Sequence, residues 1–284
     1  MGEARLPQKC GGRELEESKP RPVATWNHIR THVGARRARA EPMTPAAVAG
    51  RVLASTAAFA LLHSALASRT AKSAAARVFG ARSRNGFYRV LFNTQATMAT
   101  VALTLYLRQL PDRELYVVRG PAAALMRSGQ GAGLLLLLDA ARQVGVLPLT
   151  GTSNLMRFTH GDNPVPAEPE AQGPALDEHG RLKVRGAFLR SRHPLNLAPL
   201  PILWLNPRMT RNLAVFSAIA TAYFWIGSFH EERRLLAAYG DAYRPYVSGT
   251  VPFFFGARTL LEWRSGESAR WTQRPGDGLP SAAP

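Results

Sequence analysis

The chain has 284 residues, of which 46% are hydrophobic, and a net charge of +17 at pH 7. A single cysteine, Cys10, excludes an intramolecular disulfide and argues against a cysteine-based metal site, so we expect no metal. The high positive charge raises the question of nucleic-acid binding. However, the basic residues gather beside apolar segments, as in membrane proteins, and we expect no nucleic-acid partner.

The composition divides the chain into three parts. Residues 1–44 are rich in Arg, Glu, Gly and Pro and lack helical periodicity, which predicts a disordered basic tail. Residues 45–255 contain the apolar segments and form the predicted membrane domain. Residues 256–284 predict a polar, solvated C-terminal tail.

Three apolar segments occupy the first half of the membrane domain. They are residues 46–67, Val90–Leu107 and Ala132–Leu149. A bilayer core requires about 20 largely apolar residues in a helix, so each segment is a candidate span. The third contains Asp139 and Arg142, which lie three residues apart on one helical face and can pair.

A basic loop follows the first apolar segment. Residues 68–89 contain no acidic residue and six basic ones: Arg69, Lys72, Arg77, Arg82, Arg84 and Arg89. Positive charge beside a span keeps a loop in the cytoplasm. This assignment places residues 108–121 outside and 150–192 inside. The N-terminal tail would then lie outside, although its nine Lys or Arg residues against five Asp or Glu oppose that position.

The second half of the domain predicts a helical hairpin. After a proline-rich polar loop at 150–181, the segment Leu195–Leu205 is short and interrupted by prolines. A turn at 206–210 leads to Asn212–Phe229, eighteen residues without a charge. We therefore expect an all-α integral membrane bundle of about five helices, the last two forming a hairpin. A soluble helical bundle stays an alternative, because the spans carry polar residues.

Polar residues cluster at both ends of this hairpin. Arg192 and His193 precede it, while Glu231 and Glu232 follow it. If the hairpin crosses most of the bilayer, both clusters return to the same face and build one polar site. Charged groups beside apolar spans are costly and usually mark function.

The residues around these clusters resemble a known family. The pattern reads Gly186-Ala-Phe188, Arg192-His193-Pro194, Glu231-Glu232, Leu235, Tyr239-Gly240, Tyr243, Tyr246 and Val251-Pro252. This spaced combination is similar to the isoprenylcysteine carboxyl methyltransferase superfamily of membrane methyltransferases. Within it, the chain most resembles the methanethiol S-methyltransferase and NnrU-like branch, through residues 62–64, 87–93 and 204–210.

The resemblance implies S-adenosyl-L-methionine as the methyl donor, bound at the cytosolic membrane face. It implies catalytic roles for Arg192 and His193. The cofactor-binding residues it implies are Gly186, Phe188, His193, Pro194, Glu231, Glu232, Tyr243 and Tyr246. Carboxylates suit the ribose hydroxyls and ammonium of this cofactor, and tyrosines offer flat surfaces to its adenosine. His193 is suited to take the proton of a thiol acceptor.

We therefore expect an integral protein of a bacterial inner membrane that methylates a small, methanethiol-like thiol or a lipophilic acceptor. Two residues depart from the superfamily pattern: Asn196 replaces a usual Tyr, and Ala198 replaces a nearby Gly. These departures fit altered substrate choice or a cofactor-poor relative. The alternatives are an NnrU-like haem protein with His63 as axial ligand, and a noncatalytic membrane factor.

Overall fold

The computed structural model describes residues 2, 43–164, 172–249 and 251–254. The fold is that of the unit Met43–Pro284, which is separate from the unit Met1–Pro42. The predicted tails and Cys10 fall almost wholly outside the described residues. Those expectations therefore stay predictions.

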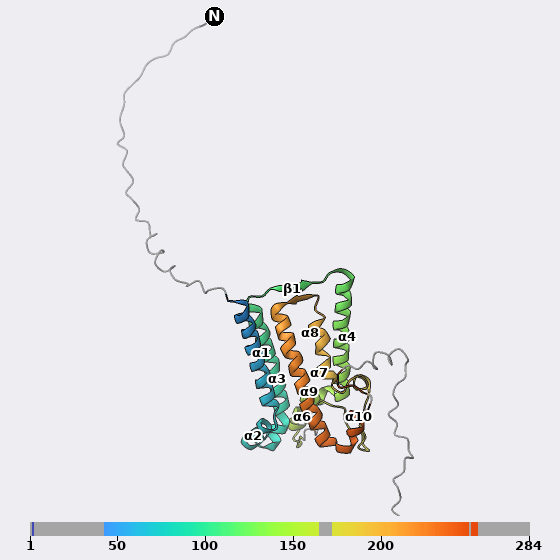
Figure 1. Cartoon of the computed structure of the whole chain (residues 1–284). Helices are drawn as coiled ribbons and strands as arrows, with labels where there is room; N and C mark the ends of the chain where they lie inside the picture. Colours follow the sequence, from blue (N-terminus) through green and yellow to red (C-terminus); the bar gives the residue numbers. More distant parts are fainter. Residues whose placement is uncertain (1, 3–42, 165–171, 250, 255–284) are drawn as a thin grey trace, which may run out of the picture. The chain divides into compact units, whose positions relative to one another are not determined.

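Four helices of more than twenty residues form the body of the described unit (Figure 1). They are α1 (Pro45–Ala67), α3 (Ala81–Gln109), α4 (Gly120–Val144) and α9 (Arg211–Tyr239). Helix α1 contacts α3 and α9. Both α1 and α9 begin at a threonine cap: Thr44 accepts from the N–H of Ala47 at 3.2 Å, and Thr210 from that of Leu213 at 3.3 Å.

Shorter helices connect these four, so the expected count of about five helices is not confirmed. They are α2 (Arg69–Phe79), α5 (Val146–Thr150), α6 (Thr152–Thr159), the 3-10 helices η2 (Gly186–Leu189) and η3 (Gly240–Ala242), α7 (Pro194–Leu197), α8 (Pro199–Trp204) and α10 (Arg244–Ser248). Prolines stand at the first position of α7 and α8, where the missing N–H costs nothing.

Three helices of the described chain are long and apolar enough to cross a membrane: Pro45–Ala67, Ala81–Gln109 and Arg211–Ala242. Their apolar side chains face outward, since Leu61 of α1 is 72% exposed and Met98 of α3 is 67% exposed. A water-soluble bundle would bury such residues. The outward apolar faces therefore support an integral membrane protein over the soluble alternative.

The third expected span was placed wrongly. Helix α4 covers Gly120–Val144 and is not among the three membrane-crossing candidates of the described residues. It ends at Gly145, which has a φ of +95° and turns the chain away. The residues from Val146 onward form α5 instead.

A short antiparallel sheet adds to the helices at one end of the unit. Strand β1 (Glu114–Val117) pairs with β2 (Arg208–Thr210), with Glu114 opposite Thr210 and Val117 opposite Arg208. Arg208 also forms an ion pair with Glu114. The sequence analysis predicted no strands in these two segments.

The expected hairpin of two continuous helices is not confirmed, because its first arm consists of α7 and α8, which meet at Pro199. These short helices still pack along α9, where Trp204 Nε1 donates to Thr221 Oγ1 at 2.9 Å. Helix α4 supports them from the other side. A Cβ at Gly133 would lie 2.8 Å from the carbonyl oxygen of Ala198, so only glycine allows this approach.

Candidate active site

The Arg-His-Pro motif lies in the turn between η2 and α7. The Ser191 hydroxyl donates to the carbonyl of Phe253 at 3.0 Å and accepts from the N–H of His193 at 3.2 Å. Pro194 then starts α7. This turn is thereby fixed against the segment near residue 253, about sixty residues further along the chain.

Arg192 joins this turn to two other elements. Its Nη1 donates to the carbonyls of Val247 and Val251, both at 3.1 Å. Its Nε lies 2.8 Å from Glu232 Oε1, and the two side chains are only 13% and 11% exposed. The N–H does not point at that oxygen, so both atoms lack a hydrogen bond within the described residues. The buried ion pair nonetheless holds α9 against the turn, and removing either partner would leave an uncompensated charge.

His193 faces the second carboxylate of α9. Its Nδ1 lies 3.4 Å from Glu231 Oε2, and its ring packs 4.7 Å from that of Phe253. The side chain is 1% exposed, yet neither ring nitrogen has a hydrogen-bond partner among the described residues. Buried polar atoms without partners are uncommon, and a catalytic role or an unseen partner is a common explanation.

Asn196 holds the Glu231 carboxylate in place. Its Nδ2 donates to Glu231 Oε2 at 3.2 Å and to Ser228 Oγ at 2.9 Å. The backbone N–H of Gln172 donates to the other oxygen of Glu231. Asn196 therefore takes a defined polar role at a position where the resembled family has Tyr. Ser228 was not among the predicted site residues, although it lies three residues before Glu231 on the same helical face.

Tyr243 and Tyr246 are both buried but differ in their partners. Tyr246 donates its hydroxyl to the carbonyl of Phe188 at 2.6 Å. The Tyr243 hydroxyl has no hydrogen-bond partner among the described residues. Burial raises the pKa of both hydroxyls, and the charge of Glu232 raises the pKa of Tyr243 further. Both tyrosines are therefore neutral at physiological pH.

Gly186 lies against helix α4 and has a backbone conformation that favours glycine. It has a φ of +50°, and a Cβ there would lie 2.5 Å from Asp139 Oδ2 and 2.8 Å from Gln143 Nε2. The positive φ would strain any other residue, whereas the two contacting groups are side-chain ends that can shift. Asp139 and Gln143 were not predicted at the site, because their helix is distant in sequence.

Polar contacts thus connect several predicted site residues. They join Arg192 to Glu232, His193 to Glu231, and Tyr246 to Phe188. The catalytic and binding roles of these residues stay predictions.

The rival haem ligand, His63, lies elsewhere and packs against three aromatic rings. Its ring centroid is 5.8 Å from Phe59, 4.8 Å from Phe92 and 6.3 Å from Tyr223. The imidazole is half-buried among these rings, and its Nδ1 has no hydrogen-bond partner among the described residues. This ring packing alone does not favour the haem-binding alternative.

Comparisons with known proteins find partial relatives of one kind. The chain is 44% identical to a methanethiol S-methyltransferase of Mycobacterium tuberculosis over 65 residues, 22% of this chain and 27% of that protein. It is 38% identical to methanethiol S-methyltransferase 1 of Bradyrhizobium diazoefficiens over 65 residues, and 39% identical to that organism's methanethiol S-methyltransferase 2 over 77 residues.

The chain is similar in part to methanethiol S-methyltransferases. The matched stretches span 23% and 30% of the two Bradyrhizobium proteins, well under two thirds of their length. No protein-family model and no solved structure matches the chain. The comparisons support this methyltransferase family and give no support to the NnrU-like branch.

Proposed function

We propose that the protein is a membrane-embedded methyltransferase that uses S-adenosyl-L-methionine to methylate a small, methanethiol-like thiol or a lipophilic acceptor. The observation that carries the proposal is the meeting of two distant segments at Arg192–Glu232 and His193–Glu231. The partial similarity to methanethiol S-methyltransferases supports the same reaction.

Polar atoms of the site that make no hydrogen bond among the described residues fit this cofactor. They are the two ring nitrogens of His193 and the Tyr243 hydroxyl, together with Glu232 Oε1, whose charge is paired with Arg192. A cofactor with an ammonium group and ribose hydroxyls would supply donors for the carboxylate and partners for the other atoms. Glu231 and Glu232 would hold those groups, and Tyr243 would contact the adenosine.

The chemistry requires a nucleophilic sulfur in line with a methyl group. When bound, S-adenosyl-L-methionine would supply an electrophilic methyl group carried on a sulfonium sulfur. In its neutral form, His193 holds a proton on Nδ1 toward Glu231 and accepts the thiol proton at Nε2. Arg192, whose charge is paired with Glu232, holds that carboxylate at the site. Asn196 orients Glu231 and hence the imidazole.

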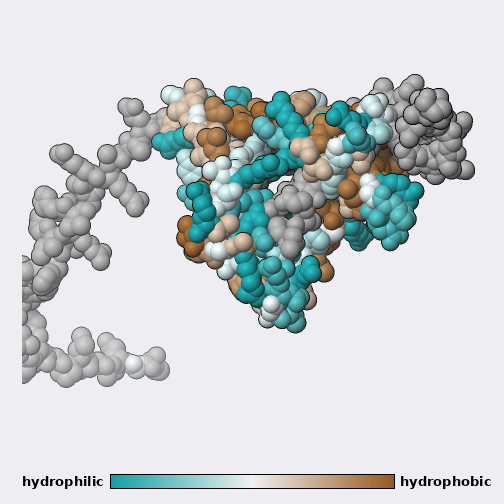
Figure 2. Space-filling model, turned by 90° about the horizontal axis from the view of Figure 1, so that it is seen from below, coloured by the Kyte–Doolittle hydropathy of each residue, from teal (hydrophilic) through white to brown (hydrophobic). Residues whose placement is uncertain are grey.

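The site is proposed to face the cytoplasm of a bacterial inner membrane. It lies toward the end of the unit that carries α2 and α10 (Figure 1), where hydrophilic residues are interspersed with hydrophobic ones (Figure 2). The same end carries the six basic residues of 68–89, which favour a cytoplasmic location. A small thiol or lipophilic acceptor would reach the site from the adjoining bilayer.

Cofactor binding by the full-length protein in detergent tests the proposal by calorimetry. We expect the unaltered protein to bind S-adenosyl-L-methionine and Glu232→Gln to weaken binding at least about tenfold, since a charged hydrogen-bond acceptor is lost. Glu178→Gln is the matched control, because that side chain is 86% exposed in a nearby loop. Absence of binding by the unaltered protein would reject the enzyme proposal and favour a noncatalytic factor.

Formation of dimethyl sulfide from methanethiol then tests the acceptor. We expect His193→Gln to lower turnover by about 10²-fold or more. The loss should be smaller at alkaline pH, where the thiolate forms without a base. Cofactor binding without methylation of the thiol would reject methanethiol as substrate.

A further inference from the structure

A row of aromatic rings runs from the outer surface of α9 to the predicted base, His193. Trp225 and Phe229 are each 45% exposed on α9, which is long and apolar enough to cross a membrane. Their ring centroids lie 5.1 Å and 4.7 Å from that of Phe253, which in turn lies 4.7 Å from the imidazole of His193. Phe253 is therefore the ring that contacts both the outward pair and the imidazole.

Phe253 is held in place by the turn that carries the Arg-His-Pro motif. The Ser191 hydroxyl donates to the Phe253 carbonyl at 3.0 Å, and the N–H of Arg192 donates to the carbonyl of Pro252, also at 3.0 Å. The Arg192 guanidinium also lies over the Phe253 ring, 5.6 Å from its centroid. These contacts fix the backbone and the ring of Phe253 beside His193.

The Phe253 ring separates the imidazole from the lipid-facing surface of α9. The His193 side chain is only 1% exposed, although Trp225 and Phe229, one ring further out, are partly exposed. Displacing a packed ring costs the dispersion contacts that it makes, so a long alkyl chain is disfavoured beside His193 and a short one is tolerated. The rings are also apolar, so a charged acceptor would lose its hydration without gaining a partner.

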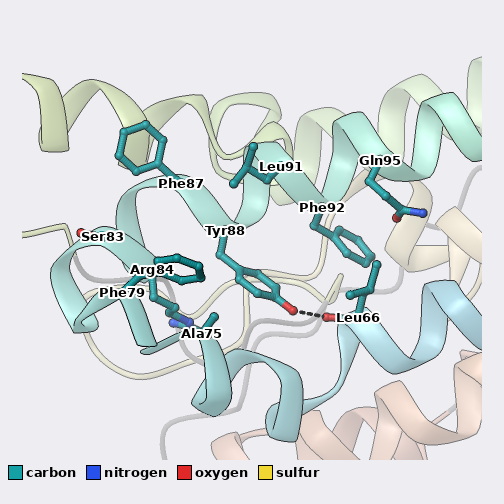
Figure 3. A pocket seen from close by; sticks show the side chains of 10 residues that line it. All are labelled: Leu66, Ala75, Phe79, Ser83, Arg84, Phe87, Tyr88, Leu91, Phe92 and Gln95. Atoms are coloured by element: carbon teal, nitrogen blue, oxygen red, sulfur yellow. Dashed lines mark hydrogen bonds between the residues drawn. The ribbon is translucent and has the colours of Figure 1, made fainter. Parts of the chain in front are cut away.

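A cavity of about 510 Å³ between α1, α2 and α3 offers a different place for an apolar molecule (Figure 3). Leu66, Phe87 and Leu91 are among its lining residues, and none of the predicted site residues lines it. An acceptor held there does not contact the imidazole, because His193 is not part of the lining. The rings beside His193, and not this cavity, are therefore the place where an acceptor can be selected.

We propose that Phe253 determines acceptor specificity and restricts the reaction to small, uncharged thiols such as methanethiol. This inference rests on the proposed methyltransferase function and narrows the acceptor to one of the two classes considered there. Trp225 and Phe229 form the lipid-facing side of the same ring cluster. Phe253 contacts the acceptor and is not required for cofactor binding.

Methylation of methanethiol and butanethiol by the full-length protein in detergent, with S-adenosyl-L-methionine present, tests the role of Phe253. We expect the unaltered protein to prefer methanethiol by at least about tenfold in kcat/KM. Phe253→Ala should reduce that preference at least about tenfold, because it removes the ring that excludes the longer chain. Phe87→Ala is the matched control, since it makes the same substitution in the separate cavity and should leave the preference unchanged. Calorimetry should show unchanged affinity for S-adenosyl-L-methionine in both variants.

Equal use of the two thiols by the unaltered protein, or an unchanged preference in Phe253→Ala, would overturn this inference and leave the methyltransferase proposal intact. A shifted preference in Phe87→Ala would assign the acceptor to the separate cavity and overturn it as well. If Phe253→Ala does not fold, Phe253→Leu should shift the preference in the same direction by a smaller factor. Methylation of neither thiol by protein that binds the cofactor would reject a small thiol as the acceptor, and this inference with it.

Discussion

Tyr243 and Tyr246 are both buried, but their hydroxyl groups differ in hydrogen bonding. Tyr246 binds the carbonyl of Phe188 and so ties α10 to the motif before α7. Tyr243 is fully buried, yet its hydroxyl has no hydrogen-bond partner among the described residues. A buried hydroxyl without a hydrogen bond costs free energy of folding. A tyrosine at position 243 is explained if a bound ligand forms a hydrogen bond with its hydroxyl.

Replacing each tyrosine with phenylalanine separates these roles. Tyr246→Phe should lower the free energy of unfolding by about 1–3 kcal/mol, because a buried carbonyl loses its donor. Tyr243→Phe should leave stability equal or higher, since an unsatisfied hydroxyl is removed. Thermal unfolding in detergent measures both effects. Calorimetry should show weaker S-adenosyl-L-methionine binding only in folded Tyr243→Phe, and unchanged affinity there would remove Tyr243 from the proposed cofactor site.

Among the helices, α4 packs closely against the α7–α8 segment at Gly133. Gly133 lies against the carbonyl of Ala198 and the ring of Pro201, where a Cβ would approach both within 2.8 Å. The resembled family has Gly near the position of Ala198, on the other side of this contact. Gly133 on α4 therefore allows the two segments to pack closely, although Ala198 carries a side chain.

Alanine substitutions at two glycines of α4 test this packing. Gly133→Ala should lower the melting temperature, because its Cβ meets the fixed backbone at the end of α7. Gly131→Ala has open space around its Cβ and should leave the melting temperature equal or higher, since alanine favours helix by about 1 kcal/mol. Circular dichroism in detergent measures both. Equal melting temperatures would show that this contact does not constrain α4.

The sequence predicts some of these elements and not others, for physical reasons. Helices α1 and α9 follow from composition, since their apolar runs match the length of a bilayer core. The end of α4 does not follow, because it depends on the positive φ of Gly145, which a sequence pattern does not reveal. Likewise, the Glu-Glu motif identifies Glu231 from the sequence. The hydrogen bond from Asn196 to Glu231 could not be predicted, because it depends on how α7 packs against α9.

For the whole molecule, the two ends of the described unit differ in character. One end carries the β1–β2 sheet, and the other carries α2 and α10 (Figure 1). The proposed active site and the basic residues of α2 both lie toward the second end. If the unit crosses the membrane, a single orientation fixes the side of both, so the sidedness of α2 also reports on the site.

Cysteine labelling in intact cells can determine that orientation. In a Cys10→Ser background, single cysteines replace Arg119 before α4, Ser73 on α2 and Glu178 near the site, all of which are exposed. We expect a membrane-impermeant maleimide to label only position 119 in intact cells and all three after permeabilisation, because the basic end stays in the cytoplasm. Labelling of 73 and 178 but not 119 would reverse the orientation. Opposite accessibility of 73 and 178 would contradict a shared face for α2 and the site.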